Sequence, residues 1–95
     1  MNNNIGGGVS KAPLSCMPQE VLRHLVKIAG LQDMTMWRTR KKEWRLSVKV
    51  KHRLHVLYLS TRRVPRVPRA FKRLEAALAA GQRVSATRQF TLVLR

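Results

Sequence analysis

Hydrophobic positions follow a helical period between Pro18 and Gly30. Apolar residues recur there every three or four positions, and the cationic residues fall on the opposite side. Pro18 suits the first position of a helix, where its missing N–H costs nothing, and Gly30 suits the left-handed conformation that ends one. A helix is therefore predicted over residues 18–29.

A second helical period begins at Pro68. Val67, Phe71, Leu74 and Leu78 recur at helical spacing and would form an apolar face. Pro68 can open this helix in the same way as Pro18, and Gly81 is expected to end it. Residues 60–70 contain two prolines and several arginines, so they are interpreted as an extended loop.

A period of two replaces the helical period in three segments. Residues 44–50 alternate apolar side chains with basic or hydroxyl ones, which predicts a half-buried strand with a basic outer face. Residues 54–59 are more apolar throughout, which favours a strand interior to the sheet. The short link 51–53 predicts an antiparallel hairpin between them. A third strand is predicted over residues 89–94.

These segments predict an α+β domain in the order α–β–β–α–β. Its small antiparallel or mixed three-stranded sheet would carry the two helices on one face. The segment around Trp37 would add an edge strand, with a turn at Lys41 and Lys42. Residues 1–16 show no period and are rich in Asn, Gly and Ser, so they are interpreted as a flexible leader before a single domain of residues 17–95.

Among the properties of the sequence, the net charge departs most from that of an ordinary small domain. The 95 residues carry 20 Lys and Arg against 4 Asp and Glu, a net charge of +16. Such an excess repels itself when the chain compacts, and the release of condensed counterions makes DNA or RNA the natural partner. No apolar stretch is long enough to span a membrane and the start lacks a signal-peptide pattern, so no membrane partner and a cytoplasmic location are expected. The modest core of so short a chain is compatible with a homo-oligomer or a protein partner.

Six cations lie in the loop and at the expected start of the second helix. They are Arg62, Arg63, Arg66, Arg69, Lys72 and Arg73. The free N–H groups and the dipole of a helix start favour phosphate, and guanidinium groups bind phosphate oxygens in a bidentate manner. A phosphate-binding site is predicted here, and a solvated basic loop is the alternative.

A second set of cations continues along the hairpin. It comprises Arg38, Arg40, Lys41, Lys42, Arg45, Lys49, Lys51 and Arg53. Lys41, Lys42 and Arg45 are expected to support the phosphate site, although a solvated sheet face would show the same alternation. Trp37 lies outside the clear periodicity and is the candidate for stacking on a base. Trp44 and Tyr58 alternate with apolar neighbours and are interpreted as core residues.

Residue types for catalysis are sparse. The four carboxylates are scattered along the sequence and Cys16 is the single cysteine, so no disulfide, no metal site and no cofactor are expected. The enzymatic alternative is a metal-independent ribonuclease, for which Glu43, His55, Tyr58 and Arg62 supply the residue types. The hairpin strands Trp44-Arg45-Leu46 and Val56-Leu57-Tyr58-Leu59 resemble those of RelE-type ribosome-dependent toxins. Those toxins continue with further strands, whereas a helix is predicted here.

Residues 54–94 also resemble a family of small plasmid-encoded partition-associated or replication-accessory proteins. The similarity lies in Val56-Leu57-Tyr58-Leu59, Arg62-Arg63, the run Pro68-Arg69-Ala70-Phe71-Lys72-Arg73-Leu74-Glu75-Ala76-Ala77, and Phe90-Thr91-Leu92. The insertion Val64-Pro65-Arg66-Val67 departs from the family, where a turn with glycine is usual. The resemblance implies a DNA-associated role in plasmid or mobile-element maintenance.

The sequence thus predicts a non-catalytic nucleic-acid-binding accessory protein, with DNA favoured over RNA. Two alternatives stay open. One is the RelE-like ribonuclease, and the other is a basic adaptor for an acidic protein partner.

Overall fold

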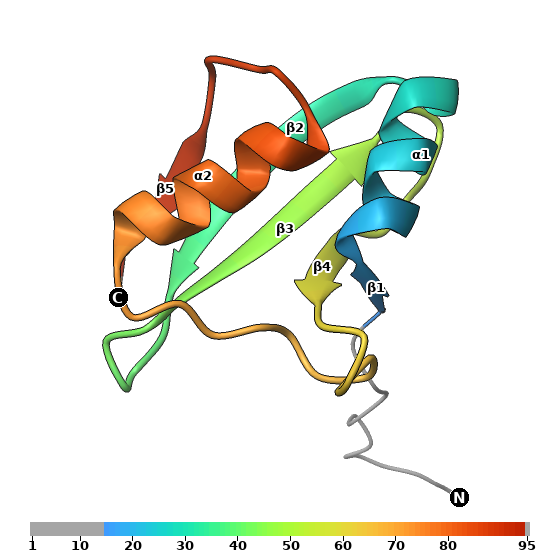
Figure 1. The fold of residues 1–95 in the computed structure, drawn as a ribbon. Helices are drawn as coiled ribbons and strands as arrows, with labels where there is room; N and C mark the ends of the chain where they lie inside the picture. Colours follow the sequence, from blue (N-terminus) through green and yellow to red (C-terminus); the bar gives the residue numbers. More distant parts are fainter. Residues whose placement is uncertain (1–14, 95) are drawn as a thin grey trace, which may run out of the picture.

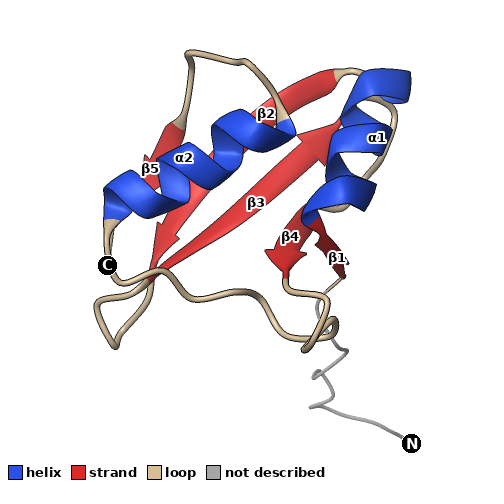
Figure 2. Ribbon diagram, viewed as in Figure 1, coloured by secondary structure: helices blue, strands red, loops and turns tan. Residues whose placement is uncertain are grey.

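The protein folds as one sheet with both helices on one face (Figures 1 and 2). A computed structural model describes residues 15–94. The elements along the chain are β1 (Cys16–Pro18), α1 (Gln19–Ala29), β2 (Leu31–Arg38), β3 (Trp44–Val50), β4 (Leu57–Ser60), α2 (Leu74–Val84) and β5 (Thr91–Val93). Each helix has 11 residues, and neither is long and apolar enough to cross a membrane.

The sheet has five strands in the order β1-β4-β3-β2-β5, so the predicted three-stranded sheet is wrong. Strand β3 runs antiparallel to β4 and β2, while the outer pairs β1–β4 and β2–β5 are parallel. Helix α1 connects β1 to β2, and α2 connects β4 to β5, each passing over two strands. Parallel strands need such a crossover connection, and the two crossovers cover the same face of the sheet.

Strands β1 and β2 account for the difference from the predicted order. The three residues of β1 are too few to show a period, and its first residue, Cys16, falls in the predicted leader. The backbone N–H of Tyr58 also donates to the carbonyl oxygen of Ser15 at 2.8 Å, so the ordered pairing begins before residue 17. Residues 1–14 of the predicted leader lie outside the described residues. The Trp37 strand exists as β2, but it lies between β3 and β5 and is not an edge strand.

Helix α1 agrees with its prediction to within one residue. Its last residue is Ala29, and the following residue, Gly30, has a φ of 91° and donates its N–H to the Val26 carbonyl oxygen at 2.8 Å. A residue with a Cβ is strained at this φ, which explains why glycine stands between α1 and β2. Leu22, a residue of α1, has a fully buried side chain that belongs to the core.

Helix α2 begins at Leu74, so the predicted start at Pro68 is wrong. The reason is a backbone pairing: Phe71 N–H donates to the Trp44 carbonyl oxygen at 2.8 Å, and Trp44 N–H donates to the Phe71 carbonyl oxygen at 2.7 Å. Residues that give their backbone groups to β3 cannot form helical hydrogen bonds. Arg69 N–H similarly donates to the Leu59 carbonyl oxygen at 2.7 Å, so the chain leaves the sheet after β4 and returns to it at residues 69–71.

Gly81 lies inside the last turn of α2 and does not end the helix, which continues to Val84. It is buried, and a Cβ at this position would come within 2.7 Å of the Met34 Sδ atom. Glycine therefore allows α2 to lie close against β2. The predicted third strand is present in shorter form as β5, which pairs with β2 at the edge of the sheet.

Strand β4 is interior to the sheet, as predicted, because it lies between β1 and β3. It begins at Leu57, three residues later than expected, and Leu54 is 89% exposed. The connection from β3 is therefore longer than the expected tight link, although the two strands pair antiparallel as predicted.

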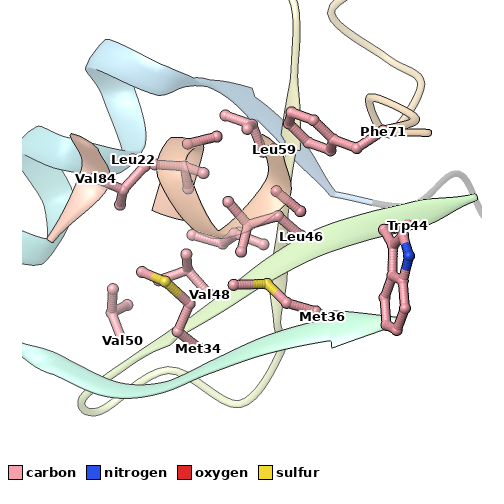
Figure 3. Close-up of a cluster of buried hydrophobic side chains, with 13 residues drawn as sticks. Leu22, Met34, Met36, Trp44, Leu46, Val48, Val50, Leu59, Phe71 and Val84 are labelled. Atoms are coloured by element: carbon pink, nitrogen blue, oxygen red, sulfur yellow. The ribbon is translucent and has the colours of Figure 1, made fainter. Parts of the chain in front are cut away.

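The core lies between the helices and the sheet face that they cover (Figure 3). Trp44 is 9% exposed and belongs to this core, as predicted. The buried apolar side chains are Leu22, Met34, Met36, Trp44, Leu46, Val48, Val50, Leu57, Leu59, Phe71, Ala77, Ala80 and Val84. Because strand side chains alternate between faces, the residues between these positions point to the other side of the sheet.

Candidate nucleic-acid interface

The sheet face opposite the helices, called the open face here, carries aromatic, basic and hydroxyl side chains. Side chains of a strand alternate between the two faces of the sheet, so the residues that alternate with the core residues of β2, β3 and β4 lie on the open face. They include Asp33, Thr35, Trp37, Arg45, Ser47, Lys49 and Tyr58. In Figure 2 both helices lie on the near side of the sheet, which leaves this face without a covering helix.

Trp37 and Tyr58 form a pair at the centre of the open face. Their ring centroids are 6.4 Å apart, and the ring planes are tilted by 44°. The Trp37 Nε1–H donates to Ser47 Oγ at 2.7 Å, and Ser47 is the residue directly opposite Tyr58 between β3 and β4. Both rings are half-buried. The prediction that Tyr58 is a core residue is therefore wrong, because its neighbours Leu57 and Leu59 occupy the covered face and Tyr58 lies on the opposite one.

A hollow of about 420 Å³ adjoins this aromatic pair. Its cationic lining comes from β2, β3 and the turn between them, and Glu43 is its single carboxylate. The residues around it are Trp37, Arg38, Thr39, Arg40, Lys41, Glu43, Arg45, Tyr58, Pro68 and Ala70. Three of the predicted site residues, Trp37, Lys41 and Arg45, therefore lie around one concave surface.

The turn between β2 and β3 positions the exposed cations beside this hollow. Lys42 N–H donates to the Thr39 carbonyl oxygen at 2.9 Å, and Thr39 N–H donates to the Glu43 carbonyl oxygen at 2.8 Å. Lys42 has a φ of 62°, the left-handed conformation that closes such a turn. The predicted turn at Lys41 and Lys42 is confirmed, and both side chains are exposed.

The six loop cations are not gathered at one helix start. Arg62 forms an ion pair with Glu20 in the first turn of α1. The Arg69 guanidinium carbon lies 4.6 Å from the centroid of the Phe71 ring, a cation–π contact. These two cations are thus each engaged within the protein.

All six of these cations are exposed, and the other four take part in neither of these two contacts. Arg63 and Arg66 lie in the loop after β4, and Lys72 and Arg73 lie in the segment directly before α2. Only Lys72 and Arg73 therefore border the start of the helix, because it begins at Leu74. This placement extends the cationic surface along the loop and does not concentrate it at the helix start.

Two acidic or thiol groups have a shifted pKa. Hydrogen bonding by the backbone of Glu20 and then by the Arg62 guanidinium lowers the pKa of the Glu20 carboxyl. Burial raises the pKa of the Cys16 thiol, and Arg45 opposes that rise. The raised pKa makes Cys16 a poor nucleophile at neutral pH, since the thiolate is the reactive form.

Tyr58 lines the hollow, although the sequence pattern had assigned it to the core. Its signal was present, because in Leu57-Tyr58-Leu59 a period of two places the tyrosine opposite the two leucines. The interpretation failed because the alternation of Tyr58 with apolar neighbours was taken to place Tyr58 itself in the core. Pro68 and Ala70 also reach the hollow, and only the return of the chain to the sheet at residues 69–71 brings them there.

The four residues considered for ribonuclease chemistry are divided among three places. Glu43 and Tyr58 line the hollow, His55 lies beside a separate hollow near β4, and Arg62 pairs with Glu20. Within residues 15–94, no three His, Cys, Asp or Glu side chains gather in a way that could hold a metal ion.

No protein-family model, curated protein or solved structure matches the chain, so its function is inferred from its own residues and their geometry.

Proposed function

We propose that this chain is a non-catalytic nucleic-acid-binding accessory protein of the cytoplasm, with DNA preferred over RNA. One observation carries the proposal: four cationic side chains surround a hollow that contains a single carboxylate, Glu43. They are Arg38, Arg40, Lys41 and Arg45. The net charge of +16 supplies the long-range attraction, and this hollow gives it a defined location.

Phosphate is the ligand that this arrangement suits best. Arginine side chains bind phosphate oxygens with two parallel hydrogen bonds, and the concave wall formed in part by Pro68 and Ala70 reduces the screening by water. The exposed Arg63 and Arg66 would continue the contact along the backbone of a long polyanion. The resemblance of residues 54–94 to plasmid partition-associated proteins supports DNA as the partner and plasmid or mobile-element maintenance as the setting.

A second candidate function has one observation in its favour. Glu43 and Tyr58 lie around the same hollow as Arg45, so two residue types used in metal-independent RNA cleavage are close to a cation. The separation of His55 and Arg62 from this hollow makes the binding function the better supported of the two.

The salt dependence of binding to duplex DNA tests the proposed location. Replacing both Arg40 and Lys41 by alanine removes two exposed cations from the hollow. Each lost phosphate contact should lower the slope of log affinity against log salt by about 0.9, so the double variant is expected to lose about 1.8 and to bind all sequences more weakly. The measurement is a titration over a range of salt concentrations.

The matched control replaces Arg23 and Lys27, two exposed cations on α1, by alanine. This control changes the net charge by the same amount as the first double variant. It should lower the slope of log affinity against log salt much less. Equal losses from the two pairs would mean a diffuse attraction without a site. Competition by acidic proteins as strong as that by duplex DNA would contradict the nucleic-acid function and support the adaptor alternative.

A further inference from the structure

The two rings on the open face lie where they add little to the core. Trp37 and Tyr58 point away from the buried cluster, and both keep part of their surface in solvent. A large aromatic side chain is normally buried for its apolar area, so two of them on a polar, helix-free face need another reason. Their ring planes are tilted by 44°, so neither ring covers the face of the other by parallel stacking.

The orientation of Trp37 is fixed before any ligand binds. Its only hydrogen-bond donor, Nε1–H, is used by Ser47 Oγ at 2.7 Å, and Ser47 is 1% exposed. The ring is therefore held by a buried partner on the neighbouring strand. Such pre-organisation lowers the entropy cost of a contact with a planar ligand.

Positive charge surrounds the aromatic pair. Arg45 is directly opposite Trp37 across the β2–β3 pairing, and both Trp37 and Tyr58 line the cationic hollow. A ligand that fits both features must carry planar rings and regularly spaced negative charge. A strand of nucleic acid with unpaired bases has both, whereas the bases of a duplex are already stacked on each other.

We propose that Trp37 and Tyr58 form a stacking platform for unpaired bases, so that a single strand of nucleic acid lies across the open face with its phosphates toward the hollow. This inference rests on the proposed function and narrows its ligand. Every base has a face that can stack, so the platform selects single strands without selecting a sequence.

The experiment compares three ligands of equal length: a short single-stranded DNA, the same strand with abasic sites in place of its bases, and the duplex. Trp37→Ala and Tyr58→Ala should each weaken binding of the normal strand by roughly 5- to 150-fold. Neither variant should change binding of the abasic strand, which keeps the phosphates and lacks the rings. Trp37→Phe should retain most of the affinity, because a phenyl ring still stacks.

Val93 provides a control on the same face. It lies opposite Trp37 in the parallel pairing of β5 with β2, and its aliphatic side chain cannot stack. Val93→Ala should therefore affect the normal and abasic strands equally. The same contrast between normal and abasic strands is expected with RNA, and tighter binding of RNA than of DNA would contradict the proposed preference for DNA.

Three outcomes distinguish a failure of the platform from a failure of phosphate binding. If the unchanged protein binds normal and abasic strands equally, or if Trp37→Ala weakens both to the same degree, the platform is wrong while phosphate binding stands. If the unchanged protein binds none of the ligands at low salt, the proposed function itself is wrong.

Discussion

Single residues decide how the segment before α2 is held, and Phe71 is the clearest case. Its side chain lies in the core and is 4% exposed (Figure 3), while its backbone pairs with Trp44 in both directions. The guanidinium carbon of Arg69, an exposed residue, lies 4.6 Å from the centroid of this ring. Phe71 thus joins the loop to the sheet through its backbone and to the core through its ring.

Phe71→Ala should lower the free energy of unfolding by about 3–5 kcal/mol, because it leaves a cavity between the sheet and the start of α2. That loss approaches the whole stability of a small domain. Urea unfolding followed by circular dichroism measures it. Val67→Ala is the control, since Val67 is 52% exposed and its loss should change the stability by less than about 0.5 kcal/mol. A Phe71→Ala protein as stable as the control would contradict this packing.

At the scale of elements, an ion pair joins helix α1 to the loop after β4. Glu20 lies in the first turn of α1, and its carboxylate accepts a hydrogen bond from Arg62. The backbone hydrogen bond at the helix start and this guanidinium together lower the pKa of Glu20. A carboxyl group with a lowered folded-state pKa stabilises the fold above its ordinary pKa, and this contribution is lost as the pH falls through the folded-state value.

Glu20→Gln should therefore reduce the melting temperature at neutral pH and make no difference at a pH below the folded-state pKa. The effect should be small, since both side chains are exposed. Arg62→Gln should give part of the same loss, while Arg63→Gln, which removes an equal charge from the same loop, should not. Thermal melts of the four proteins across the acid range provide the test. A constant difference between the Glu20 variant and the unchanged protein at every pH would show that the carboxylate charge is not the cause.

The whole molecule is expected to bind RNA without cleaving it. The residues available for general acid–base chemistry and for transition-state stabilisation are not assembled, because His55 and Arg62 lie away from the hollow of Glu43 and Tyr58. Labelled RNA and the messenger on translating ribosomes should stay intact on incubation with the protein. Gel electrophoresis of both detects cleavage. Cleavage that disappears with Tyr58→Phe or Arg62→Ala would favour the toxin alternative over the binding function.

Much of the candidate site could be predicted from local patterns. The run of cations from Arg38 to Arg45, the turn at Lys41 and Lys42 and the outward basic residues of β3 all follow from alternation and turn chemistry. The loop cations were predicted to form a phosphate site at the start of the second helix, but their arrangement depended on where α2 begins. Because the backbone of Phe71 pairs with β3, the helix begins only at Leu74. No hydrophobic pattern within residues 68–81 indicates this pairing.

The sequence by itself determined the charge, helix α1 with its glycine end and the alternation of β3, because each depends on composition or on neighbours within a few residues. Only the tertiary structure decided the five-stranded mixed sheet. Strands β1 and β5 have three residues each and pair in parallel with β4 and β2, which lie far from them in the chain. The antiparallel pairings of β3 with β2 and β4 bring Trp37 and Tyr58 side by side, and the return of the chain to the sheet at residues 69–71 brings Pro68 to the hollow. Periodicity reports which face of an element is apolar, whereas the partner of a strand is chosen by which arrangement of the whole chain buries those faces together.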